Sequence, residues 1–275
     1  MQYQDWVGRC ETVEDSVTLR QAAQMAALLD QPFPLTQGSP LPPLWHWMAF
    51  QPVAPMAGLG PDGHPARGGF LPPVPLERRM WAGGRVAFHQ PLALGVVMQR
   101  RSEVVKVVEK QGAAGAMVFV TVNHRISQSG VECVSDEQDL VFVAIPASFT
   151  PPAPQPVPPD PVWRQDQPMD PVRLFRFSAV TFNGHRIHYD LEYARNVEHY
   201  PGLVVHGPYQ ALLLIDAAQR RAGGAKPARY SYRGVRPLFH TDRLELLGLA
   251  EQEGTLTLCT ANAEGLQCMQ AKVEW

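Results

Sequence analysis

An amide and three imidazoles crowd into one stretch of the second half of the chain: Asn183, His185, His188 and His206. Apolar runs flank this stretch, and burying so many polar groups is unfavourable unless each finds a partner or a function. An imidazole is the usual group for moving a proton near neutral pH. A neighbouring carboxamide can hold one water molecule by donating and accepting hydrogen bonds. Asn183 and His188 together are therefore candidates for binding and activating a water molecule.

Gly207 is the second chemical element of this stretch. The Pro201-Gly202 pair breaks the chain shortly before it, and the apolar run 204–221 is typical of a helix. The glycine N–H then lies in the first turn, without an intrahelical partner and at the positive end of the helix dipole. Because glycine has no side chain, a ligand oxygen can approach closely. Such an N–H suits a thioester carbonyl whose oxygen becomes negative during a reaction.

A proline-rich segment, 151–170, separates two parts of domain size, 1–150 and 171–275. So many prolines exclude helix and central strand and favour an extended connector. Each part has the pattern of one long helix followed by an antiparallel meander. The helices are expected at 17–30 and 204–221, and the strands at 79–88, 96–111, 116–124, 140–145, 229–238, 243–251, 255–260 and 266–273. The predicted fold class is α+β, with two antiparallel sheets that each wrap a long central helix.

A second zone rich in proline and glycine, 31–75, lies inside the first part. Its tryptophans and apolar residues argue against disorder. We expect a long ordered loop packed onto the protein, and such loops often cover a site.

Composition narrows the classes of function. The 45% apolar fraction is typical of a globular protein, and the net charge of −2 does not favour nucleic acid as a partner. The four cysteines form no C-x-x-C pair, so neither a zinc ribbon nor a disulfide scaffold is expected. The N-terminal segment lacks the features of a signal peptide, and no apolar run reaches the length of a membrane span. These features predict a cytoplasmic protein without a membrane partner.

The central stretch resembles the MaoC-like, (R)-specific enoyl-CoA hydratases, whose motif reads D-x-N-P-x-H. Asn183 stands where that motif has aspartate, His185 where it has asparagine, and His188 matches its histidine. Gly207 matches the glycine whose N–H binds the thioester oxygen in that family. The form F-N-x-H-R-I-H-Y-D followed by Y-P-G-L-V-V-H-G-P is similar to one subgroup. That subgroup holds the mesaconyl-C4-CoA and itaconyl-CoA hydratases and the mitochondrial-type 3-hydroxyacyl-thioester dehydratases.

The first part of the chain supports the same resemblance. The segments 68–73, reading GGFLPP, and 78–84, reading RRMWAGG, are similar to the subgroup's degenerate dehydratase domain. The resemblance implies a double-hotdog fold, active residues in the second hotdog, an acyl-CoA substrate and a homodimer. It implies no metal or redox cofactor, because the thioester itself acidifies the α-carbon.

This resemblance implies a function as well. The leading hypothesis is a hydratase that adds water to mesaconyl-C4-CoA, and also to itaconyl-CoA, to give citramalyl-CoA. Gly207 would stabilise the enolate-like oxygen, and Asn183 and His188 would deliver water to the β-carbon. Because Asn183 replaces an aspartate, His188 would also manage the proton at the α-carbon.

Other residues of the motif have two possible roles each. His185 is a candidate for substrate binding. Arg186 either reaches a CoA phosphate or points to solvent, and His206 either contacts substrate or caps loop carbonyls. Asp190 is expected to cap the short helix that follows it.

Arg78 and Arg79 are candidates for a carboxylate contact. Arginine pairs with carboxylates through a bidentate fork. One of the two arginines could hold a substrate carboxylate, or both could be charges at a strand edge.

Three further functions compete with this hypothesis. A 3-hydroxyacyl-thioester dehydratase of fatty-acid synthesis would have a deep apolar tunnel beside His188. A non-catalytic acyl-CoA-binding module would bind thioesters without turnover. A thioesterase is also conceivable, because hotdog folds host that chemistry too.

Overall fold

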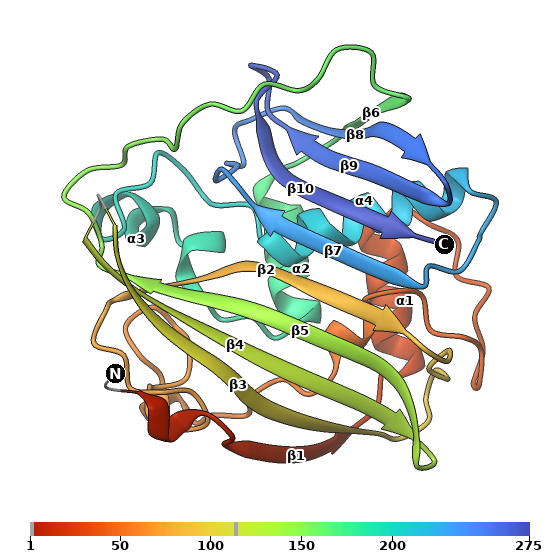
Figure 1. Ribbon diagram of the computed structural model, residues 1–275, viewed down its shortest axis with the longest axis horizontal. Helices are drawn as coiled ribbons and strands as arrows, with labels where there is room; N and C mark the ends of the chain where they lie inside the picture. The colour runs from red at the N-terminus through yellow and green to blue at the C-terminus, as the bar shows by residue number, and fades with distance from the viewer. Residues whose placement is uncertain (1–2, 113–114) are drawn as a thin grey trace.

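A computed structural model describes residues 3–112 and 115–275. Within those residues one ten-stranded antiparallel sheet curves across the whole molecule (Figure 1). Its strands are β1 Cys10–Asp15, β2 Arg78–Phe88, β3 Met98–Gly112, β4 Gly115–Gln128, β5 Val131–Val143, β6 Trp163–Gln167, β7 Arg229–Gly234, β8 Leu244–Gln252, β9 Thr255–Ala261 and β10 Gln267–Glu274.

The strand order is β1-β3-β4-β5-β2-β7-β10-β9-β8-β6, so the two halves of the chain form the two halves of the sheet in the same internal order. The two expected sheets thus join into one where β2 pairs with β7. Glycines make this junction possible. A Cβ at Gly83 would lie 2.5 Å from the carbonyl oxygen of Tyr232, and a Cβ at Gly84 would meet the Tyr232 ring.

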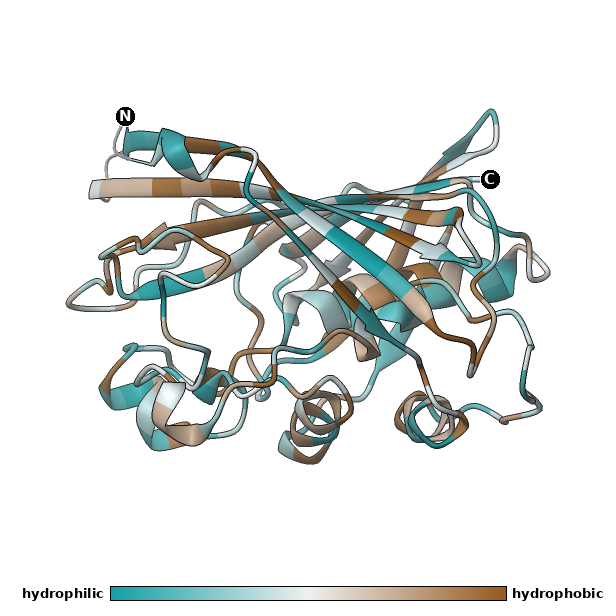
Figure 2. Cartoon of the chain, turned by 90° about the horizontal axis from the view of Figure 1, so that it is seen from below, coloured by the Kyte–Doolittle hydropathy of each residue, from teal (hydrophilic) through white to brown (hydrophobic). Residues whose placement is uncertain are grey.

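The helices form a second layer on one face of the sheet (Figure 2). They are α1 Leu19–Leu28, α2 Pro171–Val180, α3 Leu191–Asn196 and α4 Gly207–Arg221, with the short 3-10 helices η1 Gln4–Trp6, η2 Trp45–Met48, η3 Met56–Gly58 and η4 Arg186–His188. Helix α4 is buried nearly all round and packs on β2 and β7–β10, as expected for a central helix.

The first half differs from the expectation of a long helix inside each sheet. Helix α1 packs on α2 and η2 instead of lying centrally beneath the strands. Since 31–75 contains so many helix-breaking residues, no helix of the length of α4 is described there. Beneath β2–β5 lie η2 and the loop segments around it, and they leave a cavity between themselves and the sheet.

Several strands differ from the expectation: β4 continues to Gln128, beyond residue 124, and no strand was expected at β1 or β6. Strand β5 starts at Val131, well before the apolar run that begins at residue 140. Its first residues are mostly polar, but their backbones still pair with β4, so the strand is longer than its apolar part. Strand β6 lies within the proline-rich 151–170 segment and pairs with β8 at the edge of the sheet. No helix in the described residues is long and apolar enough to cross a membrane.

Candidate active site

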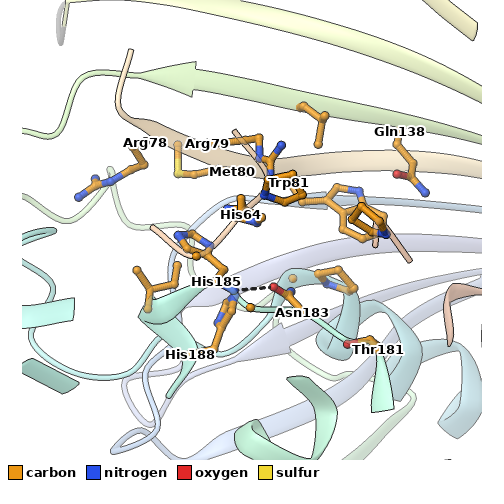
Figure 3. A pocket seen from close by; sticks show the side chains of 18 of the residues that line it. His64, Arg78, Arg79, Met80, Trp81, Gln138, Thr181, Asn183, His185 and His188 are labelled. Atoms are coloured by element: carbon orange, nitrogen blue, oxygen red, sulfur yellow. Dashed lines mark hydrogen bonds between the residues drawn. The ribbon is translucent and has the colours of Figure 1, made fainter. Parts of the chain in front are cut away.

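A cavity of about 1780 Å³ lies between the two halves of the chain and is lined by both. Figure 3 shows residues of β2 on one side of it and the Asn183–His188 stretch on the other, with His64 between them. The predicted residues Asn183, His188 and Gly207 all line this cavity. The cavity is larger than a short acyl group requires, so it has room for further parts of a larger ligand.

The end of helix α2 positions Asn183. The helix stops at Thr181, whose hydroxyl donates to the Phe177 carbonyl, and Phe182 then adopts a left-handed backbone with φ of 47°. This conformation is uncommon for a bulky residue and marks a site where surrounding structure holds strain. It turns the chain back, and Asn183 Oδ1 accepts the His185 N–H at 3.0 Å. The amide NH₂ of Asn183 has no such partner in the described residues and is free to donate.

His188 is held in one tautomer by the chain around it. Its Nδ1 lies 2.7 Å from the carbonyl oxygen of Val204, which can only accept, so Nδ1 carries the proton. In the neutral ring Nε2 is then an unprotonated acceptor. Burial, followed by the neighbouring His206 and His185, lowers the pKa of His188 well below its usual value. The ring is therefore neutral at neutral pH and able to take a proton.

His206 does not reach the cavity, contrary to the expectation of a substrate contact. Its side chain is fully buried, its Nε2 lies 2.9 Å from Ser178 Oγ, and its Nδ1 has no partner in the described residues. The ring stacks on His188 with centroids 3.6 Å apart. Burial lowers the pKa of His206 well below its usual value. His206 is thus a neutral support that fixes the plane of the His188 ring.

Gly207 begins helix α4 and is only partly buried, as expected from the sequence. Pro208 follows it and has no N–H, so Gly207 carries the N–H at the start of the helix with no N–H on the next residue. A Cβ added at Gly207 would meet Trp81 O and Met269 Cε at 3.7 and 3.8 Å, which is ordinary contact. The fold would therefore accept a methyl group here, and the open space belongs to the cavity.

His185 belongs to a buried charge network at the cavity wall. Its Nε2 lies 3.4 Å from Glu198 Oε1, and Glu198 Oε2 accepts from Arg78 Nε at 2.8 Å. Arg78 also donates to the Glu198 carbonyl and lies over the Tyr200 ring. Of the two arginines proposed for a carboxylate contact, Arg78 therefore already has a carboxylate partner within the protein, Glu198.

Arg79, one residue further on β2, is different. No described residue forms a salt bridge or hydrogen bond with its guanidinium, although Asp62 acts on it at longer range. Burial lowers the pKa of Arg79 to about 10, so the group is still a cation at neutral pH. It lines the cavity. A half-buried cation without a direct partner is a natural site for an anionic ligand group.

Arg186 and Asp190 both serve the structure. Arg186 donates to Asp190 Oδ2 from Nε at 3.0 Å and from Nη2 at 2.7 Å, and its Nη1 donates to Pro61 O. These contacts hold the guanidinium beside Asp190, which favours the structural role among the two that the sequence left open for Arg186. Asp190 caps α3 through its Oδ1, which accepts from the Tyr193 N–H at 3.0 Å, as predicted.

The sequence reasoning missed two residues, Asp62 and His64. Both belong to the loop in the proline- and glycine-rich zone, and His64 lines the cavity. Asp62 Oδ2 lies 3.0 Å from His64 Nδ1, and the two ring centroids of His64 and His185 are 4.3 Å apart. An acid and an imidazole separated by one glycine were the available signal, inside a loop already expected to cover a site.

Asp62, His64 and His185 also place one potential metal-ligand atom each within 4.8 Å of one another. Two features argue for proton chemistry instead. The Nδ1 of His64 already donates to Asp62, and the unpaired cation of Arg79 acts directly on His64. A bound metal ion would have to overcome that repulsion.

The arrangement as a whole combines three chemical capacities. His188 offers a neutral acceptor, Asn183 offers an amide donor, and Gly207 offers a backbone N–H at a helix N-terminus. A proton acceptor and an oxyanion-stabilising donor facing one cavity are the parts needed for reactions beside a thioester carbonyl.

Comparisons with known proteins agree with this chemistry. The family model described as hydroxyacyl-thioester dehydratase type 2 matches residues 44–240. The chain is 44% identical over 273 residues to the mesaconyl-C(4)-CoA hydratase of Chloroflexus aurantiacus, covering 98% of this chain and 96% of that protein. It is 28% identical over 204 residues to the mitochondrial hydroxyacyl-thioester dehydratase type 2 of Schizosaccharomyces pombe, covering 64% and 66% of the two chains.

A solved structure supports the fold. A Mycobacterium tuberculosis protein described as a double hotdog superposes with a TM-score of 0.61 at 15% identity. The match covers 97% of this chain and 95% of that chain. The double-hotdog prediction is confirmed by this likeness and by the strand order of the sheet.

Proposed function

The chain belongs to the hydroxyacyl-thioester dehydratase type 2 family, and from this premise we propose that it hydrates a C5-dicarboxylic enoyl-CoA. Membership makes it an enzyme of the hydratase and dehydratase type. The proposed substrate is mesaconyl-C4-CoA, with citramalyl-CoA as product, and itaconyl-CoA is a second candidate substrate. The observation that carries the proposal is the unpaired cation of Arg79 in the same cavity as His188 and Gly207.

The chemistry follows from the positions of the polar atoms. The Gly207 N–H binds the thioester oxygen, which withdraws electrons from the double bond and makes the β-carbon electrophilic. His188 Nε2 takes a proton from water while the water oxygen bonds to the β-carbon. Asn183 donates its amide N–H to orient that water. The enolate formed at Gly207 then needs a proton at its α-carbon to complete the addition.

This chemistry needs neither a metal nor a redox cofactor in our proposal. The thioester acidifies the α-carbon, and the charge that develops is met by the Gly207 N–H. We also propose a homodimer in solution, which analytical ultracentrifugation would test.

Replacing Gly207 with alanine tests the role of its N–H in catalysis without disturbing the fold. The added methyl group makes only ordinary contacts within the protein, and Gly207 does not have the left-handed backbone that would disfavour alanine. We expect an unchanged melting temperature. We also expect kcat to fall by about 10²-fold or more, since the thioester oxygen can no longer reach the N–H.

A Gly58→Ala variant is a suitable control for the Gly207 experiment. Gly58 has no left-handed backbone, a Cβ there would make only ordinary 3.5 Å contacts with Pro55, and the residue does not line the cavity. It should leave kcat unchanged. Full activity in Gly207→Ala would remove Gly207 from the mechanism.

Arg79 is the proposed partner of the substrate's free carboxylate. Its guanidinium can form two parallel hydrogen bonds to a carboxylate, and the half-buried setting strengthens that attraction. Uncharged acyl chains gain nothing from this cation and leave it partly desolvated and unpaired. The residue therefore favours a dicarboxylic acyl group over a fatty acyl group.

Replacing Arg79 with methionine should remove the preference for a dicarboxylic acyl group over an uncharged one. Removing one partner of a buried charge pair costs about 2–5 kcal/mol, so kcat/KM for mesaconyl-C4-CoA should fall by roughly 30-fold or more. The kcat/KM for crotonyl-CoA, which has no carboxylate, should stay level or rise. Steady-state kinetics with both thioesters measures the change.

The two substrates control for each other in this Arg79 experiment. An equal loss with both thioesters would indicate general damage to the site and would contradict a carboxylate contact. An unchanged kcat/KM for the dicarboxylic substrate would favour the fatty-acyl dehydratase function instead.

A further inference from the structure

Asp62 and His64 form a hydrogen-bonded acid–imidazole pair at the cavity wall. Asp62 Oδ2 accepts from His64 Nδ1 at 3.0 Å, and Asp62 Oδ1 accepts from the His64 backbone N–H at 3.0 Å. A carboxylate can only accept here, so His64 Nδ1 carries a proton and Nε2 is left as the acceptor. Such a carboxylate orients the ring and stabilises its charged form when Nε2 takes a proton.

The loop that carries this pair is fixed directly onto the catalytic stretch. The Arg186 N–H donates to the Asp62 carbonyl at 2.9 Å, and Arg186 Nη1 donates to Pro61 O at 3.1 Å. Gly63, with φ of 87°, lies so close that a Cβ would sit 2.0 Å from Gly184 O. Likewise, a Cβ at Gly184 would lie 2.7 Å from Gly63 O. The loop from the first half of the chain thus packs directly against the Asn183–His188 stretch. Neither glycine could carry a side chain in this arrangement.

Charges of both signs face His64. Those that act on the pair or contact its loop are Asp62 in the same turn, Arg79 on β2, His185 and His188 in the catalytic stretch, and more distantly Arg67 and Arg186. Burial lowers the pKa of His64 to about 3, and the cation of Arg79 is the next cause. Burial alone would raise the pKa of Asp62, but its hydrogen bonds with His64 lower it below the usual value. Without ligand the pair therefore holds an ionised acid and a neutral ring.

A carboxylate bound at Arg79 changes that balance. It cancels the cation that repels a proton from His64, while the negative charge of Asp62 remains. Removing a nearby like charge favours the protonated imidazole.

We propose that His64, oriented by Asp62, is a second proton-transfer residue of the active site, and that the substrate's free carboxylate at Arg79 provides the charge that protonates it. This inference rests on the proposed function, because it needs a dicarboxylic substrate. It supplies the α-carbon proton that Asn183, an amide, cannot supply.

The proton balance closes over one turnover. His188 Nε2 takes a proton from water as the oxygen bonds to the β-carbon, and the double-bond pair moves to form the enolate at Gly207. His64 Nε2–H then gives its proton to the α-carbon, and the thioester carbonyl is restored. His188 is left protonated and His64 neutral. His188 then releases its proton to solvent, and His64 takes one from solvent when the next substrate carboxylate binds at Arg79, so no net proton is gained or lost over one turnover.

The test measures protons taken up when a non-reacting ligand binds. A saturated C5-dicarboxylic acyl-CoA has no double bond to hydrate, and calorimetry in buffers of different ionisation enthalpy gives the protons bound per ligand. At neutral pH we expect measurable proton uptake for the wild-type protein, because a carboxylate at Arg79 removes the repulsion of that cation and raises the pKa of His64 on binding. We expect almost none with an uncharged acyl-CoA of the same length, and almost none with His64→Gln.

Two further variants complete this experiment. Asp62→Asn should bind the dicarboxylic ligand with reduced proton uptake, because the imidazolium loses its carboxylate. His89→Gln, which alters an exposed histidine hydrogen-bonded to Ser135, should behave as wild type. In turnover assays His64→Gln should lose about 10²-fold in kcat, the scale of one acid–base group.

The outcomes distinguish this inference from the proposed function. Binding without proton uptake, or uptake that persists in His64→Gln, would overturn the role of His64 and leave the hydratase assignment standing. If the dicarboxylic ligand does not bind to the wild-type protein, both the carboxylate contact and this inference are wrong.

Discussion

Hydration is expected to fall by about 10²–10⁴-fold in kcat when His188 is replaced by alanine, the range that a positioned acid–base residue contributes. His188 is the imidazole whose tautomer is set by the Val204 carbonyl and whose ring plane is set by His206, so Nε2 is ready to accept a proton. Asn183, the other side chain proposed to hold the attacking water, is an amide and cannot take the proton in place of His188. Steady-state absorbance kinetics on the unsaturated thioester measures the loss.

A loss of activity through unfolding must be separated from a loss of chemistry at His188. The ring is 7% exposed and stacks on His206, so the alanine variant leaves a void. His188→Gln keeps most of the volume and can still donate to Val204, so its melting temperature should stay near that of wild type while its kcat falls equally. Wild-type rates in a folded His188→Gln protein would show that the proton acceptor lies elsewhere.

The largest expected effect on stability comes from the Arg78–Glu198 pair. Glu198 is 1% exposed, accepts from Arg78 Nε at 2.8 Å and connects β2 of the first half with the turn after α3. Removing Arg78 leaves the Glu198 carboxylate buried with only His185 Nε2 beside it, and breaking a buried ion pair costs about 3–5 kcal/mol. We therefore expect Arg78→Met to lower the free energy of unfolding by that amount in urea denaturation.

The double variant tests the cause of this effect. Arg78→Met combined with Glu198→Met removes both charges, and buried pairs replaced by apolar residues are often as stable as the original. We expect the double variant to regain most of the stability lost in Arg78→Met. If both variants are equally destabilised, packing around Tyr200, and not the unpaired charge, determines the loss.

Local signals in the sequence predicted the second half of the molecule well. The break at Pro201-Gly202 and the apolar run after it placed Gly207 at the start of α4, within the helix's first turn. Asp190 has the side chain and the spacing of a helix cap, and the structure places it there. These features depend on neighbours in the chain, which periodicity and capping rules describe directly.

Tertiary placement accounts for what the sequence could not predict. Arg78 and Arg79 are adjacent and chemically alike, and only the position of Glu198, 120 residues away, distinguishes them. His206 looked available for substrate until the packing of Ser178 and His188 around it was known. Asp62 and His64 join the site because a loop from the first half meets Gly184 by close backbone approach. The Asp62-Gly63-His64 spacing is a local signal, but it does not say where the loop lies, and the other contacts have no local sequence signature.

The central claim is that this enzyme hydrates a dicarboxylic enoyl thioester, and one absorbance assay tests it most directly. The loss of the enoyl-thioester absorbance is followed with mesaconyl-C4-CoA, crotonyl-CoA and a long-chain enoyl-CoA. Chromatography follows the product formed from itaconyl-CoA, whose double bond is not conjugated with the thioester. We predict the highest kcat/KM with mesaconyl-C4-CoA, because that substrate presents its carboxylate to Arg79 while its double bond lies at His188. A highest kcat/KM with the long-chain thioester, or binding of every thioester without turnover, would contradict the account.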